Sequence, residues 1–320
     1  MYEFVNKGDK PTRTGFGEGV RDAAAINPAV VGLGADITAS VGMNLFAGEF
    51  PGRFFSLGIA EQNCIGVAAG MALSGKIPVF STYGVFAAMR TTDFIRISVC
   101  YNNLHVIIGG AHAGISVGPD GSTHQALEDI AMMRVLPNMT ILSPCDATQA
   151  RIATMKAIND LAGPVYIRFG REAVPDFTGE DQKFEIGKSD MMHEGKDATI
   201  IATGHMVWEA LQAAYALREK GIHVRVLNMH TIKPIDKDAI IKAARETGYI
   251  ITAEEHQVTG GLGGAVAEVV SSNYPVPVHF TGMPDCFGES GQPAELMEKY
   301  GMTSRAIQEL IIQNPGIRRG

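Results

Sequence analysis

Residues 61–83, EQNCIGVAAGMALSGKIPVFSTY, carry the pattern that decides the fold, a helix followed by a short buried strand. Residues 61–74 have a helical period and are rich in glycine and alanine, which permits close packing against a neighbour. Residues 77–81 form a short apolar run of strand type. The same alternation extends in both directions along the chain, and it is the usual sequence sign of a parallel α/β architecture.

The alternation divides the chain into two parts. In the first part, the expected strands are residues 30–33, 77–81, 105–108, 139–142 and 165–168, and the expected helices are 17–26, 61–74, 85–100, 125–134 and 147–158. In the second part, the expected strands are 198–202, 223–227, 249–252 and 276–280, and the expected helices are 207–220, 237–247, 263–271 and 303–313. We therefore expect an α/β fold with two doubly wound domains, residues 1–175 and a smaller one at 196–320, joined by a polar linker at 176–195.

Composition narrows the classes of function. The 320 residues are 46% hydrophobic, which excludes disorder and leaves room for two cores. The formal net charge of -7 provides no positive field for a polyanion, so we expect no nucleic-acid partner. No apolar run approaches the roughly 20 residues that span a bilayer, and MYEFVNKGDK lacks the pattern of a secretory signal. We expect a cytoplasmic protein without a membrane partner.

The four cysteines argue against a metal or disulfide framework. Cys64, Cys100, Cys145 and Cys286 lie far apart, with no C-x-x-C pair and no histidine at metal-ligand spacing. We expect buried, reduced thiols and no metal ligands from this chain.

Three segments carry candidate chemistry. Glu61 lies in the first turn of its helix, where the helix dipole favours a carboxylate, although a helix-terminal charge alone would look the same. Tyr83 and Phe86 are three residues apart and form either part of the core or a flat slot for a planar heterocycle. The third segment, GGAHAGISVGPDGSTHQALED at 109–129, follows a buried strand at the carboxyl end of the sheet, where α/β folds bind ligands.

This glycine-rich third segment contains His112, Asp120 and His124. Their spacing does not suit a metal, because no histidine pair at i,i+4 on a helix and no cysteine partner accompany them. Histidine titrates near neutral pH and exchanges protons with substrate oxygens. We therefore expect acid/base and hydroxyl-binding roles for this segment.

Two further features each allow two interpretations, one structural and one for anion binding: Arg168 and the glycine run at 259–266. Arg168 closes a predicted strand and either pairs with a carboxylate or receives an anion such as a phosphate. Arg13 is a separate basic residue in KPTRTGFGEGV. The run TGGLGGAV at 259–266 opens a helix and serves either to hold an anion or to pack closely; its spacing departs from the dinucleotide fingerprint and favours packing.

Glu61 in GIAEQN, the aromatic pair in FSTYGVF and the segment HAGISVGPDGSTHQ, in this order and at these intervals, resemble the pyrimidine-binding domain of transketolase. The second domain resembles the transketolase C-terminal domain, so the resemblance covers essentially the whole chain. The GDG motif with which such enzymes bind the diphosphate of thiamine through Mg2+ is missing; only PDG occurs, at 119–121. The chain thus resembles the C-terminal half of a split transketolase, its B-type subunit.

The resemblance implies a set of partners and a reaction. The cofactors are thiamine diphosphate and Mg2+, with the metal and the diphosphate held mainly by a separate N-terminal, diphosphate-binding subunit. A heterotetramer with two copies of each subunit is the expected form. The implied reaction transfers a two-carbon ketol unit from a ketose phosphate to an aldose phosphate.

The resemblance also implies residue roles. Glu61 would hydrogen-bond N1' of the aminopyrimidine through a protonated or proton-sharing carboxyl, Tyr83 and Phe86 would form its slot, and Asp36 would lie near the cofactor. The residues expected to contact substrate are His112 and His124, which contact hydroxyls and phosphate and shuttle protons, Asp120, which holds a hydroxyl, and Arg13, Ser40 and Arg168, which receive the acceptor phosphate.

Three alternatives compete with this interpretation. Deoxyxylulose-phosphate synthase has a similar DGSTHQ segment, but an arginine stands at its position matching His112, and it is usually one long chain. The beta subunit of 2-oxo acid dehydrogenases has a comparable length but lacks the two-histidine pattern. A non-catalytic regulatory subunit would keep the fold without the chemistry, whereas Glu61 and both histidines are present here.

Overall fold

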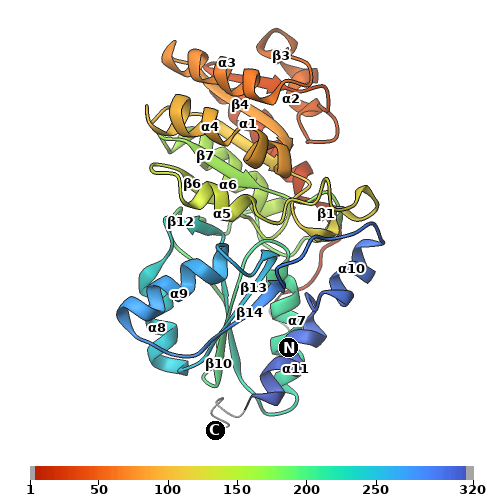
Figure 1. The fold of residues 1–320 in the computed structure, drawn as a ribbon, viewed down its shortest axis with the longest axis vertical. Coiled ribbons are helices and arrows are strands. Elements are labelled where there is room, and N and C mark those ends of the chain that lie inside the picture. Colours follow the sequence, from red (N-terminus) through yellow and green to blue (C-terminus); the bar gives the residue numbers. More distant parts are fainter. Residues whose placement is uncertain (1–3, 315–320) are drawn as a thin grey trace.

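The computed structural model describes residues 4–314, so residues 1–3 and 315–320, at the outer ends of the two expected domains, lie outside the described part. Two sheets lie one above the other in Figure 1, each covered by helices. Their predominantly parallel strands confirm the expected α/β class with two doubly wound units. No helix within residues 4–314 has the length and apolar character needed to cross a membrane.

The first sheet has seven strands in the order β12-β6-β7-β5-β4-β2-β3. Its strands are β2 (Val30–Gly34), β3 (Phe54–Ser56), β4 (Ile77–Tyr83), β5 (Ile107–Ala111), β6 (Thr140–Leu142), β7 (Val165–Arg168) and β12 (Thr231–Lys233). Its helices are α1 (Thr12–Ile26), α2 (Asn44–Glu49), α3 (Glu61–Leu73), α4 (Thr92–Phe94), α5 (Asp129–Arg134) and α6 (Ala147–Asn159). Separate apolar cores, one with α1 and α6 and one with α3 and α5, cover its two faces, which explains the continuous apolar strands.

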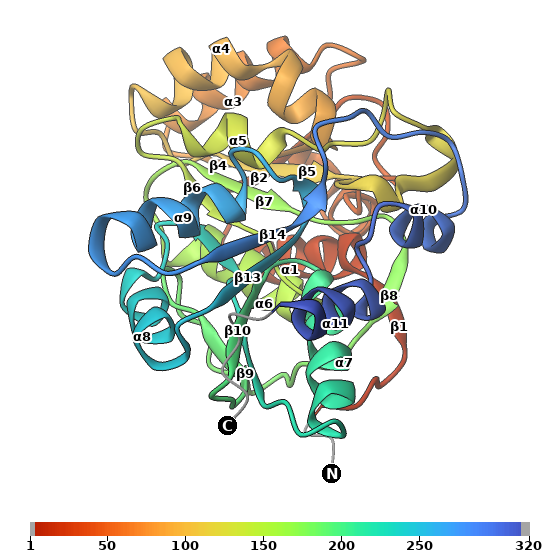
Figure 2. The same cartoon turned by 60° about the horizontal axis from the view of Figure 1, so that its bottom comes forward.

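The second sheet has the order β14-β13-β10-β11-β9. Its strands are β9 (Asp190–His193), β10 (Ala198–Ala202), β11 (Val224–Asn228), β13 (Ile250–Gln257) and β14 (Val278–Met283). Its helices are α7 (Met206–Arg218), α8 (Lys237–Thr247), α9 (Leu262–Asn273), α10 (Pro293–Lys299) and α11 (Ser304–Gln313). Figure 2 shows α8 and α9 on one side of this sheet and α7 and α11 on the other.

Two short pairings tie the halves of the chain together. Strand β12, from the second half of the sequence, pairs antiparallel with β6 and becomes an edge of the first sheet. Strand β1 (Asp9–Pro11) pairs with β8 (Ala173–Pro175), at the start of the polar segment between the two units. The expected linker at residues 176–195 follows β8 and contains all of β9.

The expected helix at 85–100 is not regular. It divides into η2 (Phe86–Arg90), α4 and η3 (Ile95–Cys100), and both η segments have π-helical geometry. Thr91 and Thr92 lie at the break, and their hydroxyls donate to the carbonyls of Ala87 and Ala88, four residues earlier. Such bonds compete with the helical ladder, and π-bulges are frequent at functional sites.

The cysteines agree with the expectation in part. Cys64, Cys100 and Cys145 are buried, and burial raises the pKa of the Cys64 and Cys100 thiols to about 11, which leaves them as unreactive apolar groups. Cys286 is exposed, contrary to expectation, because it lies on the loop after β14.

Candidate active site

The carboxyl ends of neighbouring parallel strands bring most of the candidate residues to one edge of the first sheet. Asp36 follows β2, Tyr83 ends β4, and His112 follows β5, and these strands are adjacent in the sheet. Open α/β sheets bind their ligands at this edge because the loops that follow parallel strands converge there. We therefore expect a ligand site at this edge of the sheet.

Four rings from two separate segments form a cluster at this edge. The Tyr83 ring centroid lies 4.1 Å from that of His112 and 5.7 Å from that of His124, and the Phe86 ring lies 5.5 Å from that of His124. Tyr83 and Phe86 are 5.9 Å apart and nearly parallel. Because their rings contact each other, a heterocycle has no room between them. A flat ligand would instead lie on the outer face of this pair.

Arg90 links Glu61 to the Phe86 ring. Nη1 of Arg90 donates to both carboxylate oxygens of Glu61 at 2.9 Å, and the Arg90 guanidinium lies 4.1 Å from the Phe86 ring centroid. The Glu61 side chain is 3% exposed, whereas that of Arg90 is 40% exposed. The pair thus extends from the interior to the surface over one wall of the expected cofactor slot.

Arg90 contacts two of the candidate site residues and was not predicted from the sequence. Its signal was available, because Phe86 and Arg90 are four residues apart in a segment read as a helix and so share a face. Its effect on Glu61 is direct. In this structure the carboxylate oxygens are occupied by Arg90, so a cofactor nitrogen would have to displace the guanidinium.

His112 is buried in a strained backbone position. It has a φ of 54°, in the left-handed region, and its Nδ1 atom has no partner among the described residues. Burial lowers its pKa to about 4, helped by the charges of Arg13 and Arg171 and opposed by that of Asp120. His112 is therefore neutral at pH 7, and its unpaired nitrogen is available for a ligand.

Arg171 is a second residue that the sequence reasoning missed. Its Nη1 atom lies 3.1 Å from Oδ1 of Asp120, and the same residue contributes to the low pKa of His112. Arg13 and Ser40 are also brought together, with Nη1 of Arg13 donating to the Ser40 carbonyl at 3.0 Å. The signal for Arg171 was its position just beyond the end of β7, which is the criterion that identified the loop histidines.

Arg168 lies elsewhere than expected. Its Nε atom donates to Oδ2 of Asp129 at 2.9 Å, and its Nη2 atom donates to the carbonyls of Ala126 and Glu255 at 3.1 and 2.7 Å. The Tyr166 hydroxyl donates to the same Asp129 oxygen at 2.9 Å. The structure thus resolves the open alternative in favour of the carboxylate pair. Arg171 pairs with Asp120, and Arg13 and Arg171 both act on His112, whereas Arg168 pairs with Asp129.

Asp36 and the start of the glycine-rich helix α9 each have a hydrogen-bond partner within the protein. Asp36 is exposed, has a φ of 63°, and accepts a 2.8 Å hydrogen bond from the Ser56 hydroxyl. At the start of α9, the Glu254 carboxylate accepts from the amides of Leu262 and Gly263 at 2.7 Å each. The protein's own carboxylate fills the position that an external anion would take, which favours packing for residues 259–266.

With Arg90 moved away, the arrangement fits an aromatic heterocycle that carries polar nitrogens. The Phe86 ring and the buried Glu61 carboxylate, both now in contact with Arg90, would then face the ligand. The buried Oγ1 of Thr82 and Nδ1 of His112 have no partners in the described part. Within residues 4–314, no group of three or more His, Cys, Asp or Glu side chains is arranged to hold a metal ion.

Comparison with known proteins agrees with this geometry. Residues 9–176 match the family "Transketolase, pyrimidine binding domain" and residues 187–307 match "Transketolase, C-terminal domain". The chain is 43% identical to a 6-deoxy-6-sulfo-D-fructose transketolase subunit of Clostridium sp. strain MSTE9. The alignment spans 278 residues, which are 87% of this chain and 86% of the relative.

Two further relatives extend the comparison. Identity to one of the subunits of an apulose-4-phosphate transketolase from Phocaeicola vulgatus is 42%, over 92% of this chain and 94% of the relative. A solved structure described as a split gene transketolase, inactive beta4 tetramer, is 47% identical with a TM-score of 0.86, over 95% of this chain and 97% of that one. The chain belongs to the transketolase family, as a split-enzyme subunit that carries the pyrimidine-binding and C-terminal domains.

Proposed function

We propose that this chain is the pyrimidine-binding subunit of a thiamine-diphosphate-dependent transketolase, which transfers a two-carbon ketol unit from a ketose phosphate to an aldose phosphate. The observation that carries the proposal is the buried Glu61 carboxylate beside the Phe86 face and the histidine cluster. Relatives named for a sulfonated fructose and for apulose 4-phosphate support an anionic sugar as substrate.

Thiamine diphosphate, when bound, supplies the electron sink for cleaving the bond between C2 and C3 of the ketose. Glu61 would hydrogen-bond N1' of the aminopyrimidine, and Phe86 and Tyr83 would provide the apolar surface beneath that ring. Arg90 would have to turn outward from Glu61 as the ring arrives, which its 40% exposure permits. A low local dielectric strengthens the hydrogen bond that Glu61 then makes.

The loop after β5 would hold the sugar. Neutral His112 would accept a hydroxyl proton through its unpaired Nδ1 atom, and His124, whose ring centroid lies 5.7 Å from that of Tyr83, would make a second proton transfer. Arg171 holds Asp120 in place for a sugar hydroxyl. Because Arg13 and Arg171 both act on His112 electrostatically, they would provide the positive field that receives the phosphate or sulfonate end of the sugar.

A partner chain would cover the face next to Glu61. Exposed apolar side chains lie on α3 and on the segment from η2 to the residue that follows η3, with Leu73 74%, Ile97 58% and Tyr101 85% exposed. The outward side of α3 also carries Gly66 and Gly70, so another helix could approach it closely. Exposed apolar surface of this kind marks protein interfaces. We assign this face to the diphosphate-binding subunit, which would hold Mg2+ and the diphosphate within a heterotetramer.

A reconstitution assay tests the proposal. The chain is mixed with its cognate diphosphate-binding subunit, thiamine diphosphate and Mg2+, and ketol transfer is followed by a coupled assay across phosphorylated and sulfonated ketose donors. We expect activity from the mixture and none from either chain alone, with loss of activity on chelation of Mg2+. Absence of ketol transfer from every donor would refute the proposal, and product from pyruvate would favour a deoxyxylulose-phosphate synthase instead.

A further inference from the structure

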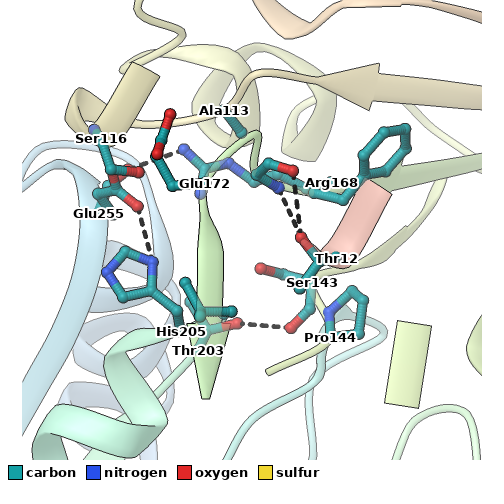
Figure 3. Close-up of a pocket in the computed structure, with 14 residues that line it drawn as sticks. Thr12, Ala113, Ser116, Ser143, Pro144, Arg168, Glu172, Thr203, His205 and Glu255 are labelled. Atoms are coloured by element: carbon teal, nitrogen blue, oxygen red, sulfur yellow. Dashed lines mark hydrogen bonds and ion pairs between the residues drawn. The ribbon is translucent and has the colours of Figure 1, made fainter. Parts of the chain in front are cut away.

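Glu255 connects the second unit to the loop that carries the candidate substrate residues. It lies near the end of β13, yet its carboxylate reaches the first unit, where Oε1 accepts a 2.5 Å hydrogen bond from the backbone amide of Ser116 (Figure 3). Ser116 belongs to the 3-10 segment η4 (Ile115–Asp120), which begins three residues after His112 and ends at Asp120. The contact therefore lies between the two candidate substrate residues along the chain.

The local sequence is built for this approach. Gly114 has a φ of 89°, and a Cβ atom at that position would lie 2.2 Å from the carboxyl carbon of Glu255. Any other residue would collide with the carboxylate as well as strain the backbone. The absence of a side chain at residue 114 thus allows the Glu255 carboxylate of the other unit to reach the amide of Ser116.

Buried charges keep this carboxylate ionised and oriented. Nδ1 of His205, just before α7, lies 3.0 Å from Oε2 of Glu255. Burial raises the pKa of Glu255, but His205, Arg168 and the Ser116 amide outweigh it and leave the pKa below its ordinary value. Burial conversely lowers the pKa of His205, but Glu255, helped by Glu209 and opposed by Arg168, raises it overall.

The space around the contact is almost filled. A cavity of about 20 Å³ lies among Ser116, Glu255, His205, Arg168 and Glu172, and it has room for roughly one water molecule (Figure 3). The cavity is too small for a sugar or a cofactor ring, so Glu255 has no room to contact a ligand there. Its contact is with the loop, through the Ser116 amide.

We propose that Glu255 is a positioning residue, which from the C-terminal domain fixes the segment that carries His112 and Asp120. The inference rests on the proposed function for the roles of these two residues, while the contact itself does not depend on it. The C-terminal domain would thereby set the geometry of the substrate site without touching substrate.

Three variants of the full chain test the contact. Glu255→Asp keeps the charge but withdraws the carboxylate from Ser116, and Glu255→Gln keeps the reach but removes the charge. Glu254→Asp is the matched control, because Glu254 is the adjacent buried carboxylate and holds the start of α9 instead. Hydrogen exchange should accelerate roughly tenfold to a hundredfold over residues 113–121 in Glu255→Asp, less in Glu255→Gln, and only over α9 in the control.

Titration of His112 by NMR gives a readout that loss of overall stability does not move. In the unaltered chain its pKa is about 4, and a loosened loop would admit water and move the pKa toward the ordinary value near 6.5 in Glu255→Asp but not in Glu254→Asp. In the reconstituted pair, Glu255→Asp should lower kcat/KM for the ketose roughly tenfold or more, with an increased KM.

The outcomes separate the two proposals. Unchanged exchange over residues 113–121, or an unchanged His112 pKa in Glu255→Asp, would overturn the positioning role whatever the enzyme does. If both change while the unaltered pair transfers no ketol unit, the positioning role stands and the proposed function fails. If both change and kcat/KM is that of the unaltered pair, Glu255 orders the loop without positioning a substrate site, and the inference is wrong.

Discussion

Two arginine–carboxylate pairs in the first unit differ in almost every respect except their chemistry. Arg168 and Asp129 are 6% and 0% exposed, and two carbonyls and the Tyr166 hydroxyl complete their hydrogen bonds. In the pair of Arg90 and Glu61, a single nitrogen serves both carboxylate oxygens, and the arginine is 40% exposed. The first pair is part of a closed network, whereas the second has one partner that can leave.

From this difference we expect the pair of Arg168 and Asp129 to serve stability and the pair of Arg90 and Glu61 to serve the proposed function. A fully satisfied buried network holds its members in one arrangement, and removal of one member leaves an uncompensated charge. A buried carboxylate whose counterion reaches solvent can exchange that counterion for a ligand that hydrogen-bonds the carboxylate, because the departing guanidinium moves into water. Substitutions in and around the two pairs can therefore break or sharpen the comparison.

The largest effect is expected at Glu61. Glu61→Gln in the reconstituted pair should lower kcat by about 10²–10⁴-fold, because the amide cannot share a proton with the aminopyrimidine. Thermal unfolding should be little changed, since the amide keeps the shape and can still accept from Arg90. Turnover and unfolding are measured on the same samples. Glu180→Gln, at an exposed ion pair with Arg151, is the control, and turnover equal to that of the unaltered enzyme would refute the role of Glu61.

Asp129 should show the largest effect on stability. Asp129→Asn removes the carboxylate that pairs directly with the buried Arg168 guanidinium and leaves only the more distant charge of Glu255, so we expect the free energy of unfolding to fall by about 3 kcal/mol. Denaturant unfolding measures the change. An unaltered unfolding midpoint would mean that this network is not the structural one, and the contrast with Glu61 would be lost.

His112 should make stability depend on pH. The folded protein holds it neutral with a pKa of about 4, while the unfolded chain protonates it near 6.5. Its contribution is therefore fully present above pH 6.5 and is lost as the pH falls toward 4, on the order of 3 kcal/mol in total. Because carboxylates titrate in the same range, the readout is the difference between the unaltered chain and His112→Gln in urea unfolding at pH 7 and pH 4.5. Parallel losses in both proteins would contradict the expectation.

The smallest effect is expected at an exposed pair on the same unit. Lys156 and Asp160 are four residues apart at the end of α6, 3.4 Å from nitrogen to oxygen, with side chains 40% and 56% exposed. Lys156→Ala should change the free energy of unfolding by no more than about 0.5 kcal/mol, because water screens the pair. A loss above 1 kcal/mol would show that exposure does not separate the pairs in this protein.

Much of the fold could be predicted from the sequence. Helices and strands with a clear period, such as α8 at Lys237–Thr247 and β7 at Val165–Arg168, begin and end at the expected residues, and Asp146 caps α6 through the amide of Gln149. The pieces that the sequence did not indicate are short, such as β12. A strand of that length carries too little pattern to detect, and its place depends on pairing with β6 from the other half of the chain.

The sequence was a better guide to which residues belong to the candidate site than to which of them form ion pairs and hydrogen bonds. The sequence by itself predicted, through the resemblance to transketolase, that Glu61, Tyr83, Phe86, His112 and His124 form one site. The structure places the four rings together and links Glu61 to Phe86 through Arg90, while the roles of these residues stay predictions. Only the tertiary structure decided which charged groups pair. Arg90 binds Glu61, Arg171 binds Asp120, Arg168 binds Asp129, and the Glu255 carboxylate accepts from the Ser116 amide of the loop. Periodicity records which residues are buried, but the pairing of charges distant in sequence depends on distances that exist only after the sheets have packed.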